Sequence, residues 1–212
     1  MTARLRRFGQ IITLISFVVV ILGTLFPYNF SFNQPHGLNF DILGSIEPRG
    51  TDLLIGVDGA LRQPFRGRID ELRIYRRPLS AAEISQDARR SADQAGASTS
   101  SDGLVAAYSF DEGNGTLVGD TSGNHNNGTI INTPAWISGA HGSGLQFDGS
   151  GQYVRVPNTP SIEVSGQALT IIMTIAIEHY RSRSDGVILA KPWKADSMGM
   201  PAYQYGVEFD AN

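Results

Sequence analysis

Acidic and amide side chains gather in the middle of the chain, where no basic residue competes for them. Residues 91–154 contain six acidic residues and neither Lys nor Arg. Asp111, Asp120 and Asp148 lie at expected strand ends or turns, close to the amides of Asn114, Asn124, Asn126 and Asn127. Ca²⁺ prefers six to eight oxygen ligands, which carboxylates, amides and the carbonyls of Gly-rich turns supply. The pattern indicates a calcium site, or side chains that brace turns by bonding their own backbone.

Aromatic side chains could bind sugars, because pyranose faces are apolar and their rims are polar. The candidates are Trp136, Tyr153, Trp193, Tyr203 and Tyr205. Such rings more often pack in a core, and the apolar surroundings of Trp136 favour that role for it. Trp193 follows Lys191 and Pro192 in an expected loop, so we predict ligand binding by Trp193, Tyr203 and Tyr205.

A pair of carboxylates near the C-terminal end of the sequence raises the question of catalysis. Glu208 and Asp210 lie two apart on an expected strand and hence on one face, as the two carboxylates of a retaining glycosidase would. Alternating acids on a strand are also typical of a solvated face. The four His residues show no metal-ligand spacing, and no nucleophile elbow or phosphate loop is present. We therefore expect no enzymatic activity.

Short apolar or alternating runs separated by Gly, Asn, Asp and Pro would position these residues. Such runs at short, regular spacing predict an all-β fold, an antiparallel sandwich of two sheets. The expected strands span 53–57, 67–75, 104–110, 128–131, 144–147, 153–156, 169–177, 186–190 and 203–209. One helix is expected over 81–90, because Ser80 and Glu83 have the spacing of a capping box.

The N-terminal residues predict a membrane anchor. Three arginines precede an apolar run over residues 8–26, which as a helix would extend about 28 Å, close to the hydrocarbon thickness of a bilayer. The arginines place the N-terminus in the cytoplasm and the rest of the chain outside, as a single-pass protein. A cleaved secretory signal is the alternative.

The composition limits the remaining classes of protein. The 212 residues include no Cys, which excludes disulfides, thiolate metal sites and a cysteine nucleophile. A net charge of −3 makes nucleic acid an unsuitable partner. Residues 91–102 lack any large apolar side chain and are expected to be a linker.

Two segments resemble a known family. Residues 103–156, with SFDEGNGT, DTSGNHNNGT, Trp136 and LQFDGSGQYVRVP, resemble the opening half of a LamG-like jelly-roll domain of the concanavalin A-like lectin/glucanase superfamily. Residues 65–84, FRGRIDELRIYRRPLSAAEI, are similar to the closing strand and helix of the same family. The closing half stands first, so the chain holds one jelly roll in permuted order or two incomplete ones.

The resemblance implies a division of the chain and a function. The parts are a basic tip with a transmembrane helix (1–32), a closing half (33–90), the linker (91–102) and an opening half (103–212). It also implies a structural calcium between the first and closing strands, held by Asp70, Asp111 and Asp120. We expect a membrane-anchored, extracytoplasmic, non-catalytic module that binds surface carbohydrate or protein.

Two other functions remain open at the level of the sequence. One is a glycan-cleaving enzyme of the glucanase branch. The other is a structural fragment of a larger VanZ-like membrane protein. Residues 25–32 (LFPYNFSF) resemble the end of the first membrane helix in VanZ-like proteins.

Overall fold

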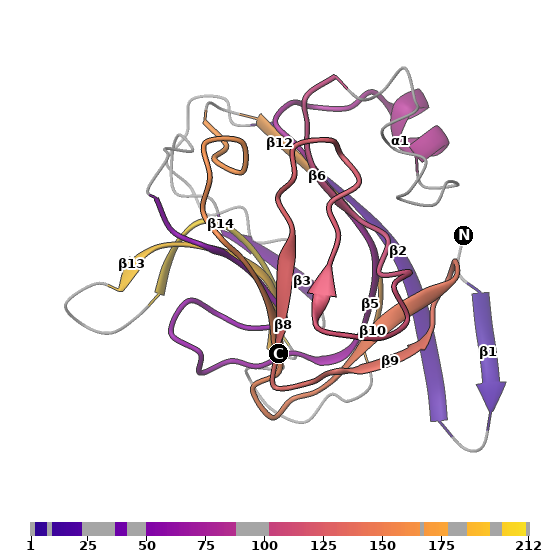
Figure 1. The fold of residues 1–212 in the computed structure, drawn as a ribbon. Coiled ribbons are helices and arrows are strands. Elements are labelled where there is room, and N and C mark those ends of the chain that lie inside the picture. Colours follow the sequence, from indigo (N-terminus) through magenta and orange to yellow (C-terminus); the bar gives the residue numbers. More distant parts are fainter. Residues whose placement is uncertain are drawn as a thin grey trace.

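Two antiparallel sheets packed face to face make up the molecule (Figure 1). The structure is a computed structural model that describes residues 3–7, 10–22, 37–41, 50–87, 102–165, 168–177, 186–195 and 201–210. All pairings between named strands are antiparallel, and little helix is present among the described residues. The expected all-β antiparallel sandwich is therefore confirmed.

The first sheet has β5 at its centre. Its order is β1 (Ala3–Arg7), β2 (Gln10–Leu22), β12 (Ala168–Ile177), β5 (Arg66–Tyr75), β10 (Ser143–Asp148) and β9 (Ala135–Ser138), with β6 (Leu104–Tyr108) also paired to β5. One edge of β5 is shared, because β10 pairs with its beginning and β6 with its end. A short stretch of β5 between these two partners is left to face loops.

The second sheet packs against the first through the shared core, and most of its strands are short. Its order is β3 (Gly37–Asp41), β14 (Pro201–Asp210), β13 (Val187–Ala195), β4 (Leu53–Ile55), β11 (Tyr153–Val156), β8 (Gly128–Ile131) and β7 (Leu117–Val118). Residues 33–90 and residues 103–212, the expected closing and opening halves, each contribute strands to both sheets. The described strands of both parts thus belong to one sandwich.

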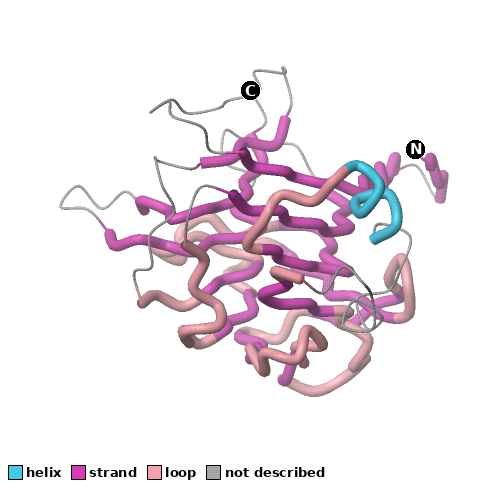
Figure 2. Tube along the Cα trace, turned by 90° about the horizontal axis from the view of Figure 1, so that it is seen from above, coloured by secondary structure: helices cyan, strands magenta, loops and turns pink. Residues whose placement is uncertain are grey.

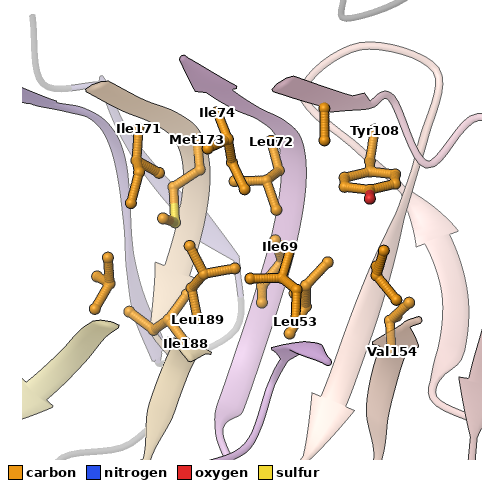
Figure 3. Close-up of a cluster of buried hydrophobic side chains, with 14 of the residues drawn as sticks. Leu53, Ile69, Leu72, Ile74, Tyr108, Val154, Ile171, Met173, Ile188 and Leu189 are labelled. Carbon is orange, nitrogen blue, oxygen red and sulfur yellow. The ribbon is translucent and has the colours of Figure 1, made fainter. Parts of the chain in front are cut away.

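Apolar side chains from both sheets fill the space between them. Figure 3 shows Ile69 and Leu72 of β5 and Ile171 of β12 facing Leu53 of β4 and Leu189 of β13. These side chains belong to one large buried cluster. Its burial is the main source of stability for such a sandwich, since each buried apolar side chain contributes about 1.5–3 kcal/mol.

A bulge interrupts β5 at Glu71. Asp70 is opposite Thr174 and Arg73 is opposite Ile172, so one extra residue of β5 fits into this interval. Glu71 has a φ of 56°, in the left-handed region. Without the bulge, every second residue after Ile69 would point into the core. With it, the next inward side chains are those of Leu72 and Ile74. Such shifts re-aim side chains, and Asp70 lies directly beside this one.

The single helix among the described residues, α1 (Ala81–Asp87), lies on the outside of the strands (Figure 2). Its capping box is confirmed: the Ser80 amide donates to Glu83 (2.8 Å) and the Glu83 amide donates to Ser80 Oγ (3.3 Å). Ile84 packs with Tyr75, Leu79 and their neighbours on the outer face of the first sheet. Residues 88–90 of the expected helix and most of the expected linker lie outside the described residues.

The transmembrane helix expected over residues 8–26 is not shown by the structure. The described part of this run is strand β2, paired with β12 from Leu14 to Leu22, rather than a helix. The run is rich in Ile and Val, whose branched side chains favour strands. No helix in the described portion of the chain has the length and apolar character needed to cross a bilayer. Membrane anchoring through residues 8–26 therefore stays a prediction.

Candidate functional site

Asp70 lies in the part of β5 that neither β10 nor β6 covers. The pairing with β10 ends at Ile69 and the pairing with β6 begins at Leu72. The loop between β9 and β10, residues 139–142, closes over this gap. Asp70 Oδ2 accepts hydrogen bonds from the backbone amides of Ala140 (2.6 Å) and His141 (3.3 Å). The carboxylate thus fixes the loop against the middle of β5.

Asp111 holds the other end of the same loop. It follows β6, and its Oδ1 accepts a hydrogen bond of 2.7 Å from the amide of Ser143. The structure therefore brings together two of the three predicted metal ligands, Asp70 and Asp111, around one loop. We name this arrangement, Asp70, Asp111 and residues 139–143, the rim site.

The loop approaches both carboxylates so closely that glycines are required. A Cβ added at Gly139 would collide with Asp70 Oδ2, and one at Gly142 would collide with the carboxylate of Asp111. Gly142 also has a φ of 54°, a conformation that other residues adopt at a cost. Sequence reasoning missed this loop, although two glycines three apart, Gly139 and Gly142, shortly before the expected strand over 144–147 are a signal of close backbone approach.

Burial makes Asp70 an unusual carboxylate. Only 4 % of the residue is exposed, and its Oδ1 has no hydrogen-bond partner. Desolvation raises the pKa of Asp70 to about 6, and the nearby charge of Asp111 adds to the rise, while the loop amides oppose it. A buried carboxylate oxygen without a partner is costly. A cation beside Oδ1 would remove that cost.

A calcium ion fits these residues in part. Asp70 Oδ1 and the carboxylate of Asp111 supply hard oxygen ligands of the kind that Ca²⁺ prefers. Among the described residues there is no group of three or more His, Cys, Asp or Glu side chains suited to a metal. Backbone carbonyls or water would therefore have to complete the coordination.

Asp120, the third predicted ligand, is engaged elsewhere. Its carboxylate accepts hydrogen bonds from the amides of Ala107, Ser122 and Asn126, each at 2.9 Å, and from the hydroxyl of Ser122. The side chain ties the turn after β7 to β6. This geometry is the turn-bracing alternative that the sequence left open, and Asp148 braces its own turn in the same way through the amide of Ser150 (2.8 Å).

The aromatic candidates are spread over the molecule. Tyr205 is fully buried in the main core, and burial raises the pKa of its hydroxyl. Its ring therefore presents no face to an external ligand in this structure. Trp193 lies in β13 rather than in a loop, and Tyr203 lies in β14; their side chains are outside the described residues. Ligand binding by these two stays a prediction.

Trp136 has the structural role that its surroundings favoured. It packs against the main core, and its Nε1 donates to the carbonyl of Gly115 (3.2 Å). This bond fastens the loop after Asp111 to β9, beside the rim site. Glu208, of the predicted carboxylate pair, is half-buried in β14 and is paired with Asn39 of β3, while the side chain of Asp210 is outside the described residues.

Comparison with known proteins identifies one segment. Residues 40–85 match the family model Laminin_G_3, described as the concanavalin A-like lectin/glucanases superfamily. No curated protein and no solved structure matches the chain. The matched segment contains β4, β5 and most of α1, the elements that carry Asp70. Residues 40–85 are thus similar to a domain of the concanavalin A-like lectin/glucanases superfamily, and the described strands form the antiparallel sandwich that this similarity implies.

Proposed function

We propose that the domain is a non-catalytic binding module in which a calcium ion at the rim site orders the loops that meet a carbohydrate ligand. The observation that carries this proposal is the buried Oδ1 of Asp70, which lacks a hydrogen-bond partner beside the charge of Asp111. A divalent cation would neutralise both carboxylates and fasten residues 139–143. The neighbouring loop after Asp111, fixed by Trp136, would then form part of the same surface.

Thermal melting of the full chain with Ca²⁺ and with chelator tests the metal. A ligand that binds only the folded state at a hundredfold excess over its Kd raises stability by about 2.7 kcal/mol. Asp70→Asn should abolish this response. Asp120→Asn is the matched control, because it should lower stability by breaking turn contacts while the calcium response persists. A wild-type melting temperature that is the same with Ca²⁺ and with chelator contradicts the metal.

Binding to a glycan array, in Ca²⁺ and in chelator, tests the ligand. We expect binding in Ca²⁺ that falls in chelator and in Asp70→Asn. Release of reducing ends from a β-glucan, lost in Glu208→Gln, would instead establish an enzyme. A folded, calcium-loaded protein that retains no glycan contradicts carbohydrate binding, and a protein ligand then becomes the alternative.

We place this module outside the cytoplasm on a membrane tether formed by residues 8–26. The support is the apolar run and the three arginines before it. Residues 14–22 cannot both cross a bilayer as a helix and pair with β12 as part of strand β2. Fractionation of cells that express the full chain should recover it with membranes, in a form that resists extraction by high salt. Recovery in the soluble fraction contradicts the tether and favours β2.

A further inference from the structure

Lys191 is a lysine enclosed in the protein on the opposite sheet from the rim site. It lies in β13, and none of its surface is exposed. Lysine is almost never fully buried unless its charge is paired. Its Nζ donates a hydrogen bond of 2.7 Å to Asn158 Oδ1 and a further bond to the carbonyl of Thr51, and it lies 3.5 Å from Glu163 Oε1. An amine, a carboxamide and a carboxylate thus meet at a fully buried Nζ, with Asn158 and Glu163 only partly exposed.

The distances place the amine next to the carboxamide carbon. Nζ is 2.7 Å from Asn158 Oδ1, and a C=O bond is about 1.2 Å long. The distance from Nζ to Asn158 Cγ is therefore less than the sum of these two lengths. Reacting atoms in a near-attack geometry are about 3–3.5 Å apart. The separation of Nζ and Cγ is therefore below about 3.9 Å, close to this range, and the reaction requires the carboxamide to turn its face toward the amine.

The surroundings also favour a nucleophilic amine. Burial lowers the pKa of Lys191, although the charge of Glu163 opposes this effect. A lysine with a lowered pKa loses its proton more readily, and the neutral amine is the form that attacks carbonyl carbon. Glu163 is near enough to accept that proton, and its side chain is 11 % exposed.

We propose that Lys191 and Asn158 become joined by an intramolecular isopeptide bond, with Glu163 as the proton carrier. The Lys191 ammonium passes one proton to the Glu163 carboxylate, and the neutral Nζ attacks Asn158 Cγ. The bond between Cγ and Nδ2 then breaks. The leaving nitrogen takes up the proton held by Glu163 and one more from Nζ, so that ammonium departs, an amide remains and Glu163 is again a carboxylate. No oxidant, metal or external reactant is required.

Neighbouring contacts hold the three groups in place before any reaction. The backbone amide of Asn158 donates to Asp52 Oδ1 (2.9 Å), and Glu163 Oε1 accepts a bond of 2.9 Å from the amide of Gly50. The segment around residues 50–52 therefore fixes both the acceptor and the proton carrier. Such positioning supplies much of the rate of an intramolecular reaction. The inference is independent of the proposed calcium site.

Mass spectrometry of the purified full chain tests the bond. We expect an intact mass below the sequence mass by one ammonia. Trypsin cuts after Arg155, Arg181 and Arg183 but not between Lys191 and Pro192, so it should release peptides 156–181 and 184–194 as one branched species. Fragmentation should locate the branch at Asn158 and Lys191.

Two variants and one competing reaction sharpen the result. Asn158→Ala and Glu163→Gln should restore the sequence mass and yield the two peptides separately. Succinimide formation at Asn114-Gly115 or Asn127-Gly128 also loses ammonia, but it leaves no branched peptide. Separate peptides 156–181 and 184–194 from the wild-type chain overturn the proposal, whatever the variants do and whether or not they fold.

Discussion

The ionisation of Asp70 should make the stability of the calcium-free protein depend on pH. Burial raises the pKa of Asp70 from 3.8 to about 6. Between these values the folded state keeps a proton that the unfolded state has lost, so stability falls as pH rises through this window and is constant above it. The loss is at most about 3 kcal/mol. Asp70→Asn should remove this slope.

Urea unfolding in chelator at several pH values from 4 to 7 measures this effect. The comparison is between wild type and Asp70→Asn, since all other titrating groups are shared. If the variant keeps the wild-type slope, the raised pKa of Asp70 is contradicted. With Ca²⁺ present the wild-type slope should be smaller, because the ion favours the ionised carboxylate.

The glycines of the rim site differ from the glycines of open turns. Gly142→Ala places a Cβ against the carboxylate of Asp111, at a φ of 54°. Gly123→Ala is the matched control: its φ is 89°, but nothing lies within 4 Å of the added Cβ. Both variants incur about 1–2 kcal/mol of backbone strain. Gly142→Ala should cost more and should also lose the response to calcium.

Calorimetry of both variants in Ca²⁺ and in chelator separates the cost of backbone strain from the cost of the contact with Asp111. Equal destabilisation of the two variants, with the calcium response intact in both, would mean that the loop yields without moving Asp111. The rim site would then not depend on the close approach of residues 139–143.

At the scale of single elements, the capping box of α1 allows the contribution of one local hydrogen bond to stability to be measured. Ser80→Ala removes the hydroxyl that accepts a bond from the amide of Glu83 and should lower the free energy of unfolding by about 1 kcal/mol. Ser85→Ala, at an exposed position of the same helix, should be neutral or slightly stabilising because Ala is the better helix former. Urea unfolding of both variants measures the difference, and equal effects would contradict the cap.

Elements with strong local signals could be predicted, and those defined by distant partners could not. The strands over 128–131 and 153–156 were expected at the bounds that β8 and β11 have, because alternation and flanking turn residues define them. Strand β7 was missed because two residues carry too little pattern, and β9 (AWIS) was missed because its residues do not alternate between apolar and polar. The bulge at Glu71 arises from pairing with β12, which no local pattern encodes.

The candidate site was predictable only in part for the same reason. That Asp70 and Asp111 lie around one loop depends on the pairing of β5 with both β10 and β6, residues far apart in the chain, and the expectation came from the family resemblance. The burial of Tyr205 was missed because alternation in 203–209 shows two faces of a strand without telling which one meets the core. Residues 8–26 are apolar enough for a membrane helix, and their many β-branched side chains also favour a strand. The sequence of this run therefore supports both structures.

At the scale of the whole molecule, the two segments on either side of residues 91–102 are interleaved rather than adjacent. In the first sheet, β5 pairs with β12, β10 and β6, all of which come from the later segment. In the second sheet, β4 lies between β13 and β11, again from the later segment. The later segment alone therefore lacks the central strands β4 and β5, and the earlier segment alone lacks the strands that flank them. Neither can bury its apolar face without the other.

This interleaving predicts fragment complementation. Residues 1–90 and 103–212, produced separately, should each fail to unfold cooperatively, because removing β4 and β5 splits both sheets and exposes the shared core. Mixed together, they should associate one to one and regain a single transition that depends on concentration. Circular dichroism melting and analytical ultracentrifugation measure both properties. A full chain with residues 91–102 doubled in length is the control, since doubling the length of the expected linker should cost only about 0.6 kcal/mol. Cooperative unfolding of 103–212 alone, as stable as the full chain, would mean that β4 and β5 add to a sandwich already complete without them.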